Sequence, residues 1–126
     1  MHIQRETPDT NTIRSYTDTQ FTVGTADYQH SAIISRDSIT SPWPIYSIDE
    51  LNEVNLEPLL ACSPELIIIG HQQLSRYTPM PVTQYLSKRR VGIECMSIGA
   101  ASRTFNVLLS EQRNVVIGII FGLINE

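Results

Sequence analysis

Five residues in the second half of the chain carry groups that could together bind a small anion. Gly70 and His71 follow one short apolar run, and Ser97 and Gly99 follow another, with Arg103 soon after. If the two runs are parallel strands of one sheet, their carboxyl ends open at the same edge, where ligands of open α/β sheets bind. A helix beginning at Ser97 would add free amide groups, a hydroxyl and a guanidinium to the imidazole. The pattern therefore predicts an anion-binding crevice lined by these residues.

The predicted helix carries a further polar candidate and also allows a structural interpretation. Asn106 lies on the same helix face as Arg103 and joins the candidate ligand-binding set. Arg103 could instead pair with Glu94 or Glu111 and hold the helix in place, because charge clusters are often structural. Both interpretations remain open from the sequence.

Catalytic chemistry has little support in the motifs. His71 could act as a base, but the sequence places no acid to orient it. The serines lack nucleophile-elbow spacing, and there is no phosphate loop, dinucleotide fingerprint or zinc-binding pattern of Cys and His. We therefore assign no catalytic residue, metal or cofactor. Whether the chain is an enzyme is left open, and a non-enzymatic role is favoured.

Periodicity in the carboxy-terminal half predicts alternating strands and helices. Ala101, Phe105 and Leu109, with Leu108, form one apolar stripe of a helix. The predicted order is strand, helix, strand, helix, strand, over residues 65–69, 81–90, 92–96, 99–112 and 114–122. A right-handed crossover makes the first two strands parallel. The connection at residues 112–114 is tight, so we expect the last strand to run antiparallel to its neighbour.

The amino-terminal half predicts short antiparallel strands. Phe21–Val23 alternates apolar and polar residues, and Tyr28–Ser35 is expected to be the return strand. A short helix is expected near residues 56–62. Trp43, between two prolines, is expected to anchor against the core edge; the alternative is an exposed contact for a protein partner.

These elements predict one α/β domain over residues 12–126, preceded by a flexible lead-in at residues 1–11. Its three layers would contain a mixed central sheet flanked by helices and an additional antiparallel β layer from the amino-terminal half. The longest apolar run, residues 115–124, is too short to cross a bilayer as a helix, which needs roughly 20 residues.

The net charge and the cysteine content limit which functions and compartments are expected. The net charge is −4, which argues against a general nucleic-acid binder. Acidic residues dominate positions 1–63 and basic residues positions 64–126, and this asymmetry weakly favours a specific protein contact. Two cysteines beside apolar runs indicate buried thiols in a reducing compartment. We expect a cytoplasmic protein in a bacterium, or a mitochondrial one in a eukaryote.

The segment at residues 100–113, AASRTFNVLLSEQR, resembles the signature of a family of small α/β domains that includes mitochondrial respiratory complex I assembly factor 3. The matching positions are Arg103, Thr104, Asn106, Leu109, Glu111 and Arg113. The strand ending at Gly70 also matches. Family members often carry a second glycine two positions later, where this chain has Gln72, so a cradle built on two glycines is in doubt.

The resemblance implies a mixed sheet between helices and a largely uncharacterised, non-enzymatic interaction or assembly role. The implied partners are proteins, with subunits of a respiratory membrane complex as one class. The alternative is a domain that binds or converts a small anion in the crevice near Gly70, Ser97 and Arg103.

Overall fold

The computed structural model describes residues 10–123 and contains two β-sheets, two α-helices of more than one turn and two single helical turns in that range. The strands are β1 (Ile13–Tyr16), β2 (Phe21–Val23), β3 (Ala26–Tyr28), β4 (Ala32–Ile34), β5 (Ile39–Thr40), β6 (Leu66–His71), β7 (Gly92–Ser97) and β8 (Val115–Ile119). The helical elements are η1 (Ile48–Glu50), α1 (Glu57–Leu60), α2 (Met80–Lys88) and α3 (Ile98–Ser110). Residues 1–9, most of the predicted lead-in, lie outside the described range.

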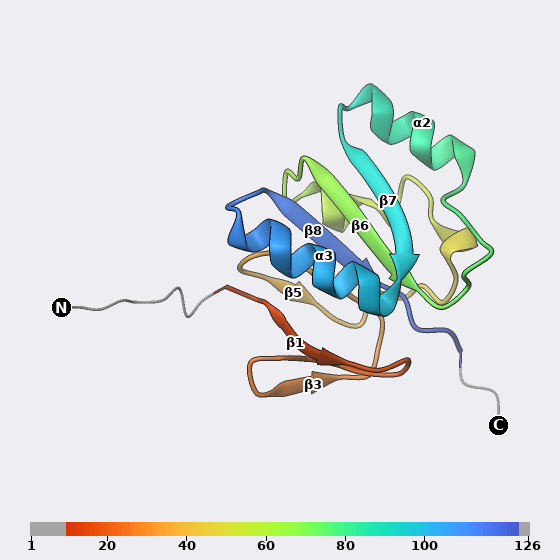
Figure 1. Ribbon diagram of the computed structural model, residues 1–126. Helices are drawn as coiled ribbons and strands as arrows, with labels where there is room; N and C mark the ends of the chain where they lie inside the picture. The colour runs from red at the N-terminus through yellow and green to blue at the C-terminus, as the bar shows by residue number, and fades with distance from the viewer. Residues whose placement is uncertain (1–9, 124–126) are drawn as a thin grey trace.

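The larger sheet has the strand order β5-β4-β8-β6-β7 and is mixed (Figure 1). β6 pairs in parallel with both β7 and β8, and β4 pairs antiparallel with β8. The expectation of an antiparallel last strand therefore holds for β4 and is wrong for β6. α3 returns the chain across the sheet before β8 begins, so β8 enters the sheet in the same direction as β6 and separates it from β4.

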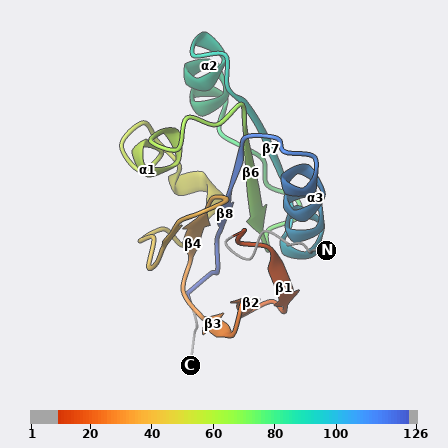
Figure 2. The same ribbon diagram turned by 90° about the vertical axis from the view of Figure 1, so that its left-hand side faces the viewer.

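The elements form layers around this sheet, as the edge-on view shows (Figure 2). One face carries α3 and the three-stranded antiparallel sheet β1-β2-β3, whose apolar side chains share a core with β6 and β8. The other face carries a second core, to which η1, α1 and α2 contribute. The prediction of a mixed central sheet with helices and an additional antiparallel β layer is confirmed.

The apolar stripe of α3 packs into the core and holds the helix against the sheet. Ala101, Phe105 and Leu109 are all buried, at no more than 1% exposure. Ser97 caps the helix, because its hydroxyl accepts a hydrogen bond from the amide of Ala100 at 3.2 Å. Burial of a side chain such as Phe105 stabilises the fold by about 2–3 kcal/mol.

In the amino-terminal half, one local prediction is wrong and another is confirmed with narrower bounds. Tyr28–Ser35 is not one return strand: Tyr28 ends β3, and β4 begins at Ala32 in the other sheet. The chain changes sheets between them, which strand alternation alone does not reveal. The predicted helix at residues 56–62 is confirmed as a shorter turn, α1.

Trp43 is only 3% exposed, and its Nε1 donates a hydrogen bond to the carbonyl of Asn55 at 3.1 Å. The prediction that Trp43 anchors against the core is therefore confirmed. Its ring also fills the space above Gly118 of β8, where an added Cβ would lie 2.7 Å from the indole. A buried Trp43 is not the exposed aromatic of the alternative interpretation.

The amino end of β6 is closed by a polar network. The Glu65 carboxylate accepts hydrogen bonds from Nε of Arg113 at 2.7 Å and from the amide of Asn114 at 3.2 Å. The Asn114 side chain donates in turn to the carbonyl of Ser63. Arg113 holds the pKa of Glu65 below its ordinary value of 4.5, chiefly through their hydrogen bond.

Candidate functional site

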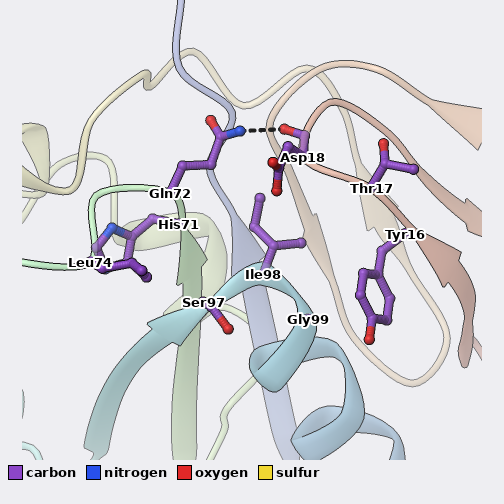
Figure 3. A pocket seen from close by; sticks show the side chains of 9 residues that line it. All are labelled: Tyr16, Thr17, Asp18, His71, Gln72, Leu74, Ser97, Ile98 and Gly99. Carbon is purple, nitrogen blue, oxygen red and sulfur yellow. Dashed lines mark hydrogen bonds between the residues drawn. The ribbon is translucent and has the colours of Figure 1, made fainter.

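A cavity of about 380 Å³ opens at the carboxyl ends of β6 and β7 (Figure 3). We call it the Ser97 cavity. Its wall comes from three places far apart in the sequence: the end of β1 with the turn that follows, the end of β6 with its loop, and the junction of β7 with α3. The lining residues are Tyr16, Thr17, Asp18, His71, Gln72, Leu74, Ser97, Ile98 and Gly99.

The parallel pairing of β6 with β7 brings the end of β6 beside the start of α3, where Gly70 faces α3 and the His71 side chain faces the other side of the sheet. His71 and Ser97 are register partners in the ladder, so their side chains leave the sheet on the same side. Ile98 and Gly99 begin α3, and the first amides of a helix have no acceptor within it. The structure brings His71, Ser97 and Gly99 to one edge of the sheet, as the sequence predicts, and ligand binding there stays a prediction.

His71 is 2% exposed, and its Nδ1 accepts a hydrogen bond from the amide of Gln73 at 3.1 Å. Burial lowers the pKa of His71 from its ordinary value of 6.5, while the nearby Asp49 carboxylate acts in the opposite direction. The imidazole is therefore neutral at pH 7. Because Nδ1 is an acceptor, the proton must lie on Nε2, which makes His71 a hydrogen-bond donor toward other groups.

The loop after β6 is tied down on both sides of the cavity. Gln72 donates from Nε2 to the carbonyl of Asp18 (Figure 3). Its Oε1 accepts the amide of Gly122 at 3.1 Å, so one side chain joins the β1–β2 turn to the segment after β8. Gln73 accepts a hydrogen bond from Ser47 at 3.0 Å. Arg76 forms an ion pair with Asp49 of η1. These contacts hold the loop over His71.

Tyr16 closes one side of the cavity. A Cβ added to Gly99 would lie 2.8 Å from the Tyr16 ring, so the glycine permits their close approach. Arg103 donates a hydrogen bond from Nη1 to the Tyr16 hydroxyl at 2.5 Å. Within residues 10–123, Arg103 has no ion pair, so the alternative pairing with Glu94 or Glu111 is not found. Arg103 stands behind Tyr16 rather than in the cavity wall.

Two residues that were predicted to bind a ligand make contacts within the fold instead. Gly70 packs under α3, where an added Cβ would lie 2.8 Å from Cβ of Ala101. The Asn106 side chain bonds both the amide and the carbonyl of Ile13, each at 2.9 Å, and so ties α3 to β1. Neither residue lines the Ser97 cavity.

Residues of the β1–β2 turn were missing from the sequence-based site. Thr17 and Asp18 line the cavity although they precede His71 by more than fifty positions. Their polar turn composition predicts exposure, but no sequence pattern indicates that the amino-terminal sheet folds against this edge. Leu74 was missed as well, because its loop has no periodicity.

The Ser97 cavity adjoins two further hollows along the same edge. The middle hollow, about 250 Å³, shares His71 and Gln72 with the cavity. The Trp43 hollow, about 220 Å³, shares Tyr46 and Leu123 with the middle one. Large exposed apolar side chains border the row, and we call them the apolar rim: Tyr16, Tyr46, Leu74 and Leu123.

Residues 10–123 lack the features of two other classes of site. No group of three or more His, Cys, Asp or Glu side chains in this range is arranged to hold a metal ion. None of the helices formed by these residues has the length and hydropathy of a membrane-spanning helix.

The fold is that of a known class of small α/β domains. The chain superimposes on the solution structure of a Xanthomonas campestris protein with a TM-score of 0.83 and 30% identity, covering 100% of this chain and 96% of that one. A Bordetella pertussis protein described as a Mth938-like domain gives 0.77 at 20% identity, covering 96% and 91%. A Bartonella henselae protein, described as an outer membrane protein, gives 0.79 at 25% identity, covering 92% and 98%.

Residues 13–120 match the family described as "Protein of unknown function (DUF498/DUF598)", and the chain belongs to that family. A Francisella tularensis protein named "13 kDa major membrane protein" is 27% identical over 103 residues, 81% of this chain and 84% of that protein. The expected membership in a family of small α/β domains of unknown function is confirmed.

Proposed function

We propose that this chain is a non-enzymatic interaction protein that binds an extended segment of a partner protein along the row of hollows at the carboxyl ends of β6 and β7. The observation that carries the proposal is the apolar rim. Tyr46, Leu74 and Leu123 are 46%, 72% and 68% exposed, yet they border adjoining depressions rather than being scattered. Clustered exposed apolar side chains beside hollows are typical of protein-binding surfaces, and aromatic residues supply much of the binding energy there.

The chemistry of the edge favours binding over catalysis. A base that activates a serine needs an unprotonated ring nitrogen facing the hydroxyl. In His71 that nitrogen is Nδ1, and the amide of Gln73 occupies it. Ser97 already accepts the capping hydrogen bond from Ala100. The Ser97 hydroxyl keeps its own proton, but His71 offers it no unprotonated ring nitrogen.

The partner class follows from the relatives and from the family resemblance. One relative is named a major membrane protein and another is described as an outer membrane protein. The resemblance to complex I assembly factor 3 adds respiratory complexes as one kind of membrane-bound partner. We therefore propose an assembly-factor-like role in the bacterial cytoplasm, in which the chain reaches a membrane-bound complex through a protein subunit of that complex.

The test places a photo-crosslinking amino acid at Leu74 or at Val107, which is 53% exposed on α3 and outside the three hollows. In the native cell, a partner should be captured at position 74 and identified as a subunit of a membrane-bound complex. Leu74→Lys should weaken its retention at least tenfold, as loss of a central apolar contact does. Val107→Lys is the matched control and should retain it. Equal capture from both positions, or retention by Leu74→Lys, would contradict the proposal.

A further inference from the structure

We propose that the outer edge of β7 is an interaction surface at which two copies of this chain pair as antiparallel strands and join their larger sheets into one. This inference is independent of the partner proposal above, because it concerns the backbone groups of a strand edge rather than the apolar rim. β7 is the outermost strand of the larger sheet, and within the part of the chain described only β6 pairs with it (Figure 1).

The first argument is that β7 lacks most of the protection that sheet edges usually have. Natural edge strands are short, bulged, covered, or interrupted by proline or lysine. Among the other edge strands formed by residues 10–123, β5 has two residues, β3 has three, and β1 contains a break in its register. β7 has six residues in unbroken register with β6, without proline or lysine, and none of the six is buried.

The second argument is the direction of the backbone groups. The amide of Gly92 donates to the carbonyl of Glu65 at 3.1 Å, so the backbone groups of Gly92 face β6. Because this direction alternates along a strand, the amides and carbonyls of Ile93 and Cys95 face away from β6. No loop backbone of the described chain bonds to these outward groups. They are therefore available to a second strand.

The third argument is that the edge is complementary to itself in one register. With Cys95 opposite Cys95 of the second copy, Ile93 lies opposite Ser97, and each such pair would exchange two backbone hydrogen bonds. Glu94, which is exposed, then lies opposite Met96. Registers that keep each side chain on its own face of the sheet differ by two residues. The neighbouring register would place Glu94 opposite Glu94 and set like charges against each other.

The fourth argument is charge, which favours a second copy over an unrelated strand. Residues 88–90, Lys-Arg-Arg, are exposed at the amino end of β7. Asp18 lies at the carboxyl end, where it lines a cavity together with Ser97. An antiparallel pair brings the basic end of each copy beside the acidic end of the other. The two Arg90 positions stay about 33 Å apart in this register, because ten positions at roughly 3.3 Å separate them.

The first experiment measures the association in solution. A pair of short strands is small compared with the roughly 1,200–2,000 Å² of a stable interface, so we expect a weak and reversible dimer. Sedimentation velocity should show monomer converting to dimer as the protein concentration rises, and added salt should reduce the dimer fraction because it screens the opposite charges.

Amide hydrogen exchange then locates the interface. When nine-tenths of the protein is dimeric, exchange at Ile93 and Cys95 should slow about tenfold relative to dilute protein, since it then requires dissociation. The amide of Glu94 faces β6 and is the internal control, because its exchange should change less.

The two cysteines of the chain provide a second experiment. Hydrogen-bonded residues that lie opposite each other in antiparallel strands have Cα atoms about 5.5 Å apart, within the range of a disulfide. Oxidation by copper–phenanthroline, with oxygen as the electron acceptor, should therefore join wild-type chains through Cys95. Cys62→Ser should crosslink as the wild type does, and Cys95→Ser should not. Cys62 is the matched control because it is also a partly exposed free thiol.

A charge at the centre of the proposed pair should break it. Cys95→Lys would place two ammonium groups opposite each other and should weaken the dimer at least tenfold, whereas Cys62→Lys should not. A protein that stays monomeric at every concentration would leave the edge to a strand of another protein and overturn the proposal. A dimer with fast exchange at Ile93 and Cys95, crosslinking by Cys95→Ser, or unchanged dimerisation of a folded Cys95→Lys variant would also overturn it, since each shows a different interface.

Discussion

The two ends of β6 differ in how their polar groups are satisfied. At the amino end, the Glu65 carboxylate accepts two hydrogen bonds, from Arg113 and from Asn114, and Asn114 also lines a hollow of about 330 Å³. At the carboxyl end, His71 is buried with one ring nitrogen unpaired, and three hollows adjoin one another. We call the end at Glu65 the closed end, because its carboxylate is hydrogen-bonded within the chain, and the end at His71 the open end.

The comparison separates groups that stabilise the fold from groups that are available to a partner. At the amino end, Glu65 is hydrogen-bonded to Arg113 and Asn114, so these groups contribute to the stability of the fold. At the carboxyl end, the His71 imidazole uses Nδ1 to accept a hydrogen bond from Gln73, and Nε2 has no partner among residues 10–123.

The largest effect is expected where the open end depends on close packing. Gly70→Ala should destabilise the protein by about 1–3 kcal/mol, because the new methyl would lie 2.8 Å from Cβ of Ala101 and 3.3 Å from Cα of Ile98. The free energy of unfolding from chemical denaturation measures this. Gly122→Ala is the matched control at the same end, since its Cβ would meet nothing closer than 3.6 Å. Equal stability of the two variants would show that α3 does not pack tightly on β6.

A smaller effect is expected on the pH dependence of the protein's stability, through His71 at the open end. Burial lowers the folded-state pKa of His71 below the ordinary value of 6.5, so the unfolded chain takes up a proton first as the pH falls. Stability contributed by neutral His71 should be present above pH 6.5 and be lost progressively below it. His71→Asn keeps an acceptor for Gln73 and cannot titrate, so its stability should lose this dependence.

Denaturant unfolding between pH 7 and pH 5 measures this change. His30→Asn is the matched control, because it removes another imidazole and leaves His71 in place. If His71→Asn and the wild type lose stability in parallel over this range, the buried imidazole does not titrate as proposed.

The smallest effect is expected at the closed end. Arg113 lowers the pKa of Glu65 below its ordinary value of 4.5, so the stability that Glu65 contributes is present above pH 4.5 and is lost as the pH falls through the folded-state pKa. Both side chains are nearly half exposed, at 46% and 47%, and water screens their attraction. Glu65→Gln should therefore reduce the loss of unfolding free energy at acid pH only slightly. If Glu65→Gln changes the pH dependence of stability more than His71→Asn does, the expected order of the two effects is wrong.

Much of the fold could be predicted because it follows from local patterns. The stripe through Ala101, Phe105 and Leu109 requires a helix with one buried face, and the capping serine marks its start. The continuous apolar run of β6 is typical of a strand that is buried on both faces. The strand order could not be predicted from local patterns, because the insertion of β8 between β4 and β6 depends on how α3 crosses the sheet.

The candidate site was only partly predictable. His71, Ser97 and Gly99 were expected together because parallel strands bring their carboxyl ends to one edge. Asn106 shares a helix face with Arg103, yet it binds Ile13, a partner that is 93 positions away. Periodicity gives the face of a helix and not the element that packs against it.

The sequence by itself determined which residues are buried in α3 and β6 and which donors stand at the ends of β6 and β7, because these depend on neighbours within a few positions. Only the tertiary structure decided that the turn at Thr17 and Asp18 closes the cavity, that Arg103 meets Tyr16, and that Trp43 is buried. These contacts join segments through space, and their free energy depends on packing between layers that no local pattern specifies.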